Sequence, residues 1–600
     1  MTLRALIHTE RNQGFIYSLI MGTAIFVYVT GGAIINPTKR DWLMLGDSAQ
    51  HYLGWEFFRN TPLWQWPIGA NYPLGMELSS SIVFTDSIPI AAFIAKLLNP
   101  VLPSTFQYLG IWIWLCFVLQ AYFAQRFLKF FTSNRTQVYL ATCFIILSPP
   151  LIYRLVHAGH GHIALASHWL ILASLYLYLR PGKNDLNWSV LIALCWMIQA
   201  YFAPMIAAVW LSHLVKRFYV DRKQFAIFKS IGFIAIASFL AMWASGYFMI
   251  GSNFNPEGWN YVFRWQPLSL VDSGTEGSTG WSHILEDRGQ LSGENEAFSF
   301  LGVGVIMIMV ISLVKIINSA YGKKLLVPLS ILSGSFLFLI SVTQMISISK
   351  LLSATALLIV IAFMGITLFK HLADSGSGRT YLPLFIAVAL LALYSMTNSV
   401  GFAQRTLFTY PLFPPLSQFT ETFRTHGRSI WPAYYVLILG SVVYVIRNFK
   451  AKIAITVLAV SLAVQFLETI PAINSARSRF INETIWVSPL KDPRWLDLAA
   501  NYTNIVVVPP LNNDPDQLWI AIDDFAARNR LNTNSGYFSR FDSNTLRTYS
   551  EQLSRELRDG TADQNSIYIV NDPLLETFFK SNPNSSFTPF RLDNFLVIAP

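Results

Sequence analysis

Long runs of apolar residues, separated by short polar or basic segments, fill the first 470 residues of the chain. Twelve runs approach or exceed the length that a helix needs to cross a bilayer: 14–35, 105–127, 136–153, 163–180, 188–215, 225–250, 298–318, 325–346, 351–371, 381–397, 430–447 and 451–468. Pro204 interrupts the run 188–215, and because proline removes a helical hydrogen bond we expect two helices that meet at a bend. The pattern therefore predicts about thirteen transmembrane helices.

Basic residues alternate between the two sides of the predicted bundle. They gather in every second connection: Arg126, Lys129 and Arg135; Arg180 and Lys183; Lys216, Arg217, Arg222 and Lys223; Lys323 and Lys324; Lys370 and Arg379; Arg447, Lys450 and Lys452. Because basic loops stay in the cytoplasm, we expect a cytoplasmic N-terminus and outer loops at 36–104, 154–162, 251–297 and 398–429. The alternation requires that the apolar stretch 82–98 does not cross, so it is expected to lie on the outer interface.

The composition changes at about residue 470, where polar and charged residues become frequent. Strand-like runs cover 504–508, 566–570 and 595–598, and helical stretches cover 518–528 and 544–557. Such interleaving is typical of an α/β domain. We expect a polytopic α-helical membrane domain at 1–469 and a small α/β extracytoplasmic domain at 470–600.

The overall composition agrees with a membrane protein. Hydrophobic residues make up 53% of the chain and charged residues 13%, and the mean hydropathy is +0.43. A soluble enzyme, a collagen-like fibre and a disordered scaffold are excluded, because about a quarter of the residues of a soluble protein are charged. The net charge of +10 does not indicate a nucleic-acid partner, since the basic residues lie between the apolar runs.

Ionisable residues are almost absent from the apolar runs and gather in the outer loops. Because ion-coupled transporters bury charges near mid-bilayer, this distribution favours a site at the outer membrane surface. Asp47 lies a dozen residues beyond the first run, where a partly desolvated carboxylate can act as a general base or can cap a helix. Asp86, three residues before Pro89, has the same two interpretations, a functional acid or a cap.

Two basic segments are candidates for binding. Arg154-Leu-Val-His157-Ala-Gly-His160-Gly-His162 follows a span and offers donors to a phosphate or a sugar. Its histidines leave a metal site open, but no Cys or Glu nearby completes a tetrahedral set, so we expect neither a metal nor another cofactor. Arg405, Arg424, His426 and Arg428 precede or begin the span at Trp431-Pro432, where they can form an anion cradle or contact lipid headgroups. Trp259, Trp265 and Trp281 can stack on a sugar ring.

The layout resembles that of the multi-spanning glycosyltransferases of the GT-C fold. Gly46-Asp47-Ser48, Phe84-Thr-Asp86-Ser, the histidine segment, the segment 423–432 and Asn532-Thr-Asn-Ser-Gly-Tyr537 with Arg540 are similar to segments of an uncharacterised bacterial membrane-protein family assigned to that fold. Many such enzymes carry two acids close in sequence, whereas Asp41 and Asp47 here are six residues apart.

The resemblance implies a transfer of a sugar from a polyprenyl-phosphate-linked donor to an acceptor hydroxyl of a glycan, lipid or protein at the outer face of a bacterial inner membrane. It implies Asp47 as the base and Asp86 as a second acid, with Arg405, His426 or Arg428 holding the lipid phosphate. Two other function classes remain as alternatives. One is a transporter or flippase of lipid-linked glycans, and the other is a non-catalytic cell-envelope assembly subunit.

Overall fold

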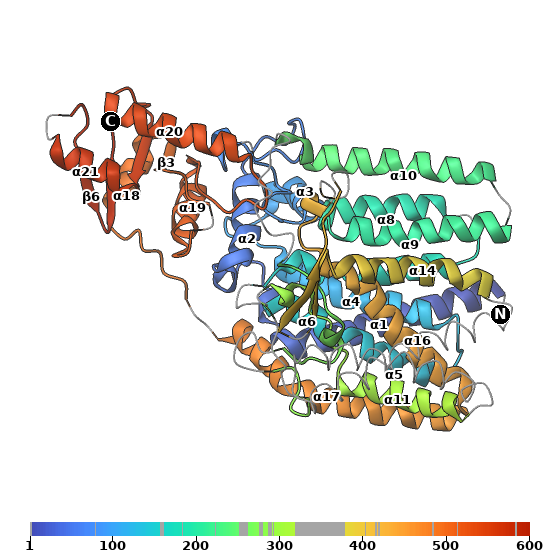
Figure 1. Cartoon of the computed structure of the whole chain (residues 1–600). Coiled ribbons are helices and arrows are strands. Elements are labelled where there is room, and N and C mark those ends of the chain that lie inside the picture. Colours follow the sequence, from blue (N-terminus) through green and yellow to red (C-terminus); the bar gives the residue numbers. More distant parts are fainter. Residues whose placement is uncertain are drawn as a thin grey trace.

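The chain forms a bundle of long helices with a small mixed domain at one end in the computed structural model (Figure 1). The structure describes residues 3–78, 80–156, 161–182, 184–221, 224–250, 262–274, 280–285, 291, 293–318, 378–402, 404–413, 417, 420–482, 485–512, 514–582 and 585–600. The expected spans 325–346 and 351–371 lie outside these residues.

Among the residues that the structure describes, six segments are long and apolar enough to cross a membrane: Gln13–Thr30, Leu109–Leu128, Arg135–Val156, Ile227–Ser245, His426–Asn448 and Ala451–Ile481. Shorter apolar helices occupy Pro89–Val101, Ile163–Leu179, Asp185–Ile198, Val303–Ile316 and Thr380–Ser395. The chain is therefore a membrane protein by the length and composition of its helices, and the count of about thirteen crossings stays a prediction.

Twelve helices of the described residues make up the bundle. The helices are α1 (Leu3–Thr30), α4 (Leu109–Leu128), α5 (Arg135–Ile146), α6 (Pro149–Val156), α7 (Trp169–Leu179), α8 (Asp185–Ile198), α9 (Phe202–Lys216), α10 (Gln224–Ser245), α11 (Val303–Ile317), α14 (Gly378–Ser395), α16 (Trp431–Asn448) and α17 (Ala451–Ile481). The break expected near Pro204 is confirmed, since Gln199 to Tyr201 separate α8 from α9.

The N-terminus lies at one end of the bundle (Figure 1). Arg126 donates to the Tyr176 hydroxyl at 2.6 Å, and Arg217 forms an ion pair with Asp185 at 2.6 Å. The small domain lies at the opposite end. The orientation of these two ends relative to a membrane stays a prediction.

The segment 82–98 does not form a crossing helix. Its only helix is α3 (Pro89–Leu98), and ten residues span about 15 Å, half the hydrocarbon thickness. Ile94, Leu97 and Leu98 are at least half exposed. An exposed apolar face on so short a helix fits the expected interfacial position.

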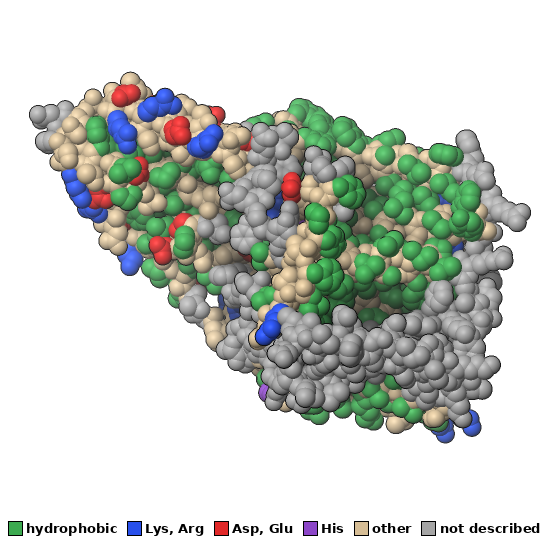
Figure 2. Space-filling model, in the orientation of Figure 1, with side chains coloured by type: hydrophobic (Ala, Val, Ile, Leu, Met, Phe, Trp, Pro, Cys, Tyr) green, Lys and Arg blue, Asp and Glu red, His purple; other side chains and the backbone are tan. Residues whose placement is uncertain are grey.

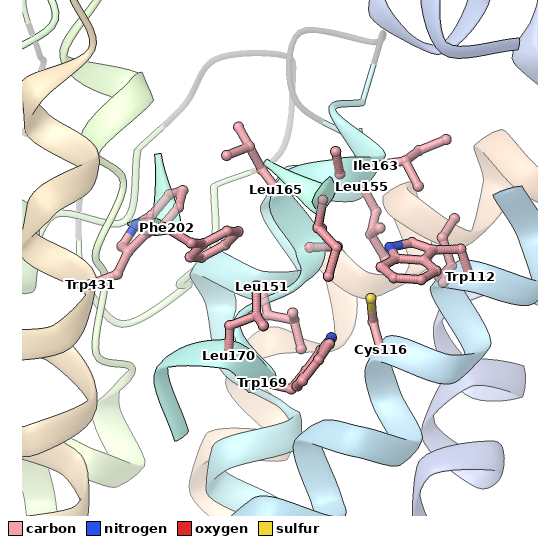
Figure 3. Packing of buried hydrophobic residues seen from close by; sticks show 14 of the residues in the cluster. Trp112, Cys116, Leu151, Leu155, Ile163, Leu165, Trp169, Leu170, Phe202 and Trp431 are labelled. Atoms are coloured by element: carbon pink, nitrogen blue, oxygen red, sulfur yellow. The ribbon is translucent and has the colours of Figure 1, made fainter. Parts of the chain in front are cut away.

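The interior of the bundle, toward the end that carries the C-terminal domain, is filled by large side chains from several helices. Figure 3 shows Trp112 and Cys116 of α4 beside Trp169 of α7, and Phe202 of α9 beside Trp431 of α16. The Trp112 indole donates to the Ser167 hydroxyl at 3.3 Å. This packing fixes the helix ends on which the outer loops rest.

The outside of the bundle is apolar. Hydrophobic side chains cover the helices on the face seen in Figure 2, whereas charged side chains gather on the small domain. On α10, Phe228, Ile236 and Phe239 are more than half exposed. Such a surface is expected where helices face lipid.

The C-terminal domain holds a five-stranded sheet in the order β4-β3-β5-β7-β6. Its strands are β3 (Asn504–Val508), β4 (Asn532–Thr533), β5 (Ser566–Val570), β6 (Phe590–Leu592) and β7 (Phe595–Ile598), and its helices are α18 (Arg494–Asn501), α19 (Leu518–Asn529), α20 (Ser543–Asp559) and α21 (Pro573–Ser581). β3 pairs in parallel with β4 and β5, and β7 runs antiparallel to β5 and β6. The three strands and two helices expected here are confirmed.

The C-terminal domain is bonded to the first outer loop, which includes α2 (Gly46–Phe58). Gly75 N–H donates to Thr533 O at 2.7 Å, and Thr533 N–H donates to Pro73 O at 2.8 Å. Arg40 forms a salt bridge with Asp524 of α19. α17 itself continues to Ile481, past the expected domain boundary at 469.

Candidate functional site

A cavity of about 590 Å³ opens where the ends of several helices meet the C-terminal domain. Its ionisable lining comes from many separate parts of the chain and comprises Asp47, Asp86, His162, Tyr201, Tyr247, Glu296, Arg424, Arg428, Tyr537 and Arg540. An apolar part of the wall includes Trp196, Met242 and Phe248. The cavity therefore combines acids, guanidiniums and an apolar side.

Asp47 lies in the first turn of α2 and lines the cavity. The residue at the N-cap is Leu45, and it makes no side-chain capping bond. Asp47 therefore does not occupy the capping position that one interpretation gave it. Its carboxylate interacts electrostatically with Arg479 of α17, and it helps to raise the pKa of Tyr537, which burial raises most.

Asp86 has a left-handed backbone with φ of 52°, a conformation that is uncommon for a residue other than glycine. Its Oδ1 accepts a hydrogen bond from Gln199 Nε2 at 3.0 Å. Burial raises the pKa of Asp86, while the Gln199 bond and Arg428 act in the opposite direction. The cap of α3 is Ile88, without a side-chain bond, so Asp86 faces the cavity instead of capping that helix.

His162 lies beside Asp86, with its Nε2 3.6 Å from Asp86 Oδ2. The ring of His51 from α2 meets the His162 ring edge to face, with centroids 5.0 Å apart. Burial lowers the pKa of His51 to about 3, and burial, His51 and Arg428 lower the pKa of His162 well below its usual value. Burial therefore disfavours the charged form of both imidazoles. His157 and His160 lie outside the described residues.

Glu296 joins two of the expected arginines. Its Oε2 accepts from Arg154 at 2.7 Å and from Arg428 at 2.7 Å. Arg154 is fully buried and also donates to the Asn295 and Glu296 carbonyls. Arg154 therefore positions Glu296, whereas Arg428 lines the cavity and stacks over Tyr201 at 4.5 Å.

The remaining basic candidates separate into two groups. Arg424 lines the cavity beside Arg540 of the C-terminal domain, and burial and Arg540 lower the pKa of Arg424. His426 is buried with its Nε2 3.1 Å from Thr420 O, which places it behind the cavity wall. Arg405 is exposed on β2 (Arg405–Thr409), away from the residues that line the cavity.

The tryptophans of the loop 251–297 do not offer a stacking surface where the structure describes them. Trp265 is buried and donates to the Ser299 hydroxyl at 3.0 Å, and Trp281 packs edge to face on Tyr153. Trp259 lies outside the described residues. This loop instead brings Glu296 to the cavity.

Sequence reasoning missed Glu296, Gln199 and His51 as parts of the site. His51 follows Asp47 by four residues, a spacing that puts both side chains on one helix face, so a helix prediction at 46–58 could have found it. Glu296 and Gln199 carry no such signal, because each reaches the cavity through tertiary packing.

Chemically, the cavity can hold an anionic group and remove a proton beside it. Three guanidiniums, from Arg424, Arg428 and Arg540, line it, and guanidiniums bind phosphate oxygens in bidentate geometry. Asp47 and Asp86 line the same cavity, where partly desolvated carboxylates can act as bases.

Two family descriptions match the chain. The description "Domain of unknown function (DUF6311)" matches residues 19–357 and 352–470, and "DUF6311 C-terminal domain" matches residues 494–600. No curated protein matches the sequence.

Proposed function

The chain belongs to the DUF6311 family, whose function is unknown, and we propose that it is a membrane glycosyltransferase that uses a lipid-phosphate-linked sugar. The observation that carries the proposal is the meeting of carboxylates and guanidiniums in one cavity at the end of an apolar bundle. The GT-C resemblance of the sequence agrees with it. The proposed setting is the outer face of a bacterial inner membrane, with the C-terminal domain in the periplasm.

In the proposed reaction, an acceptor hydroxyl attacks the anomeric carbon of the donor sugar. The new carbon–oxygen bond forms as the bond to the phosphate oxygen breaks, and the electron pair of that bond leaves with the phosphate. Asp47 accepts the hydroxyl proton. Arg424, Arg428 and Arg540 stabilise the charge that grows on the phosphate, the kind of contribution that is usually largest.

The apolar wall supports a lipid-linked donor. Phe248 and Met242 line the cavity and belong to the outer end of α10 or follow it closely, and the rest of α10 is largely exposed. A polyprenyl tail can therefore leave the cavity along an apolar surface and remain in the membrane. The proposed partners are this donor, membrane lipids and an acceptor glycan, lipid or protein.

The test is transfer in vitro with Asp47→Asn. The full chain in lipid nanodiscs is incubated with polyprenyl-phosphate sugars and candidate acceptors, and products are measured by mass spectrometry. We expect Asp47→Asn to lower the rate by about 10²- to 10⁴-fold, the contribution typical of a general base. Asp41→Asn, in the same outer loop but not lining the cavity, is the matched control.

Equal rates for wild type and Asp47→Asn would refute the role of Asp47. The absence of any transfer, together with flux of lipid-linked glycan across vesicles, would favour a flippase. If neither transfer nor flux occurs while the gene is needed for the surface glycan, an assembly subunit is favoured.

A further inference from the structure

Three side chains of the type that bind transition metals meet beside the cavity. They are His51 of α2, Asp86 of the first outer loop and His162 of the segment after α6. One ligand atom from each lies within 4.8 Å of the other two. Because the three residues come from separate segments, tertiary packing brings them together.

The two histidines have buried nitrogens that nothing in the described part of the chain satisfies. Neither nitrogen of His51 has a hydrogen-bond partner there, nor has Nδ1 of His162. His51 is fully buried and His162 is 8% exposed. A buried polar atom without a partner costs free energy, so such atoms are rare unless a water or an ion binds them.

The carboxylate is held in an orientation suited to a ligand. Gln199 donates to Asp86 Oδ1, and this leaves Oδ2 directed toward His162. Outer hydrogen bonds of this kind orient the ligands of metal sites. Asp86 and His162 also line the cavity, so one side of the group is open to it.

We propose that His51, Asp86 and His162 bind one divalent transition-metal ion of the zinc class, with a further coordination position open to the cavity. Two imidazoles and one carboxylate suit zinc better than magnesium or calcium, which prefer oxygen ligands. A tetrahedral zinc site separates its ligand atoms by about 3.4 Å, so ion binding requires the three side chains to approach one another from the observed spacing.

The site differs from the metal alternative that the sequence left open, which used only the histidines of the segment 154–162. Here the second imidazole comes from α2, 111 positions before His162 in the printed sequence. Three protein ligands and one open position are typical of catalytic zinc sites. A role for the ion in binding the donor phosphate rests on the proposed function, whereas the metal site itself rests on the geometry alone.

The experiment measures the metal directly. The full chain, with an affinity tag that contains no histidine, is purified in detergent, stripped with a chelator and titrated with Co²⁺. Binding is followed by the visible absorption of Co²⁺, and Zn²⁺ then displaces it and is counted by elemental analysis. We expect one Zn²⁺ per chain.

Variants of the ligands and of their neighbour decide the assignment. Gln199→Ala should weaken Co²⁺ binding by about 10- to 100-fold, the usual effect of a lost outer partner, and Asp86→Asn and His51→Gln should weaken it more. His283→Gln, at an exposed histidine, is the matched control and should bind like wild type.

A wild-type chain without stoichiometric Zn²⁺, or ligand variants that bind Co²⁺ like wild type, would overturn the proposal. If His51→Gln is not monodisperse, Asp86→Asn, which keeps the side-chain shape, decides alone. Zn²⁺ binding without sugar transfer would refute the proposed function and leave the metal site standing. Sugar transfer by a chain that binds no Zn²⁺ would refute only the metal site.

Discussion

Glu296 determines how the basic wall of the cavity is arranged. It lies between Arg154 and Arg428, both more than nine-tenths buried, and accepts a hydrogen bond from each. Removing one partner from a buried ionic group leaves an uncompensated buried charge. This lowers the free energy of unfolding more than replacing all the charged residues of the group by apolar ones. The expected cost therefore follows from burial and not from the number of contacts.

We expect Glu296→Gln to lower the free energy of unfolding by about 3–5 kcal/mol. The measurement is the thermal unfolding midpoint in detergent. The double variant Glu296→Gln with Arg428→Gln should recover part of the loss, because it removes one of the unpaired guanidiniums. A single variant that unfolds at the wild-type temperature would contradict this account.

Glu56 gives a pH-dependent contribution to stability. Burial raises its pKa to about 7, although Arg59 opposes the shift. The folded-state pKa of Glu56 is above its unfolded value. The contribution of Glu56 to the free energy of unfolding is therefore fully present in acid, below the unfolded pKa, and is lost as the pH rises toward and through 7. Arg59 keeps three other acceptors, Asn99 Oδ1, Ser104 O and Pro103 O.

Glu56→Gln should therefore stabilise the protein by roughly 2–3 kcal/mol at pH 8.5 and by much less at pH 5. Thermal unfolding across this pH range is the measurement. Glu551→Gln, at an exposed residue of α20, is the control. A stability difference that does not change with pH would be evidence against the raised pKa.

Helix packing in the bundle depends on small residues at close contacts. A Cβ added to Gly22 of α1 would lie 2.6 Å from the Val118 backbone of α4. Close approach through glycine is a common way for membrane helices to associate. Gly232 of α10, by contrast, has no atom within 4 Å of an added Cβ.

We expect Gly22→Leu to separate α1 from α4 and to destabilise the protein by about 3 kcal/mol, the upper part of the usual range, since the clash is with backbone. Gly232→Leu should be tolerated. The measurement is the yield of monodisperse protein and its unfolding midpoint. Similar behaviour of the two variants would show that α1 and α4 are not closely packed.

Helices and strands with a strong local pattern of apolar residues could be predicted from the sequence. The residues at which they begin and end could be predicted less well. β3, β5 and β7 occupy the expected residues because each is a short apolar run. The apolar run of α17 ends at about 468, yet the helix continues to Ile481, because hydropathy reports burial in lipid and not helix length. Glu468 is polar but accepts from Val303 N–H at 2.6 Å, a partner that no local pattern reveals.

The candidate site could be predicted only in part, because local sequence patterns reveal some of its residues and tertiary packing supplies the others. Asp47, Asp86 and Arg428 were found because a charge beside an apolar run is conspicuous, and they do line the cavity. Arg154 and His426 have the same signal but lie behind the wall, since side-chain direction depends on packing. Glu296 and His51 needed the tertiary structure.

At the scale of the whole molecule, the two domains are held together by an ion pair and backbone bonds. Arg40 pairs with Asp524, and Ser539 N–H donates to Phe84 O at 2.8 Å. These contacts bring Tyr537 and Arg540 to the cavity. Without docking, the cavity would lack one of its walls.

We expect Asp524→Arg to release the C-terminal domain, because like charges would face each other at a cost of about 3–5 kcal/mol. Limited proteolysis of the segment 482–493 should become more than tenfold faster. The double variant Arg40→Asp with Asp524→Arg restores the pair with reversed charges and should recover resistance. Equal cleavage of wild type and Asp524→Arg would show that this ion pair does not hold the domains together.

The wall shared by the two domains has a consequence for chimeras. Thr533 and Ser539 bond to the backbone of the first outer loop, and Arg540 donates to Thr422 O at 3.0 Å. A C-terminal domain grafted from another family member therefore carries part of the cavity with it. Such a graft should function only when the outer loops that it contacts are transplanted as well, so the two domains are expected to be inherited and exchanged as one unit.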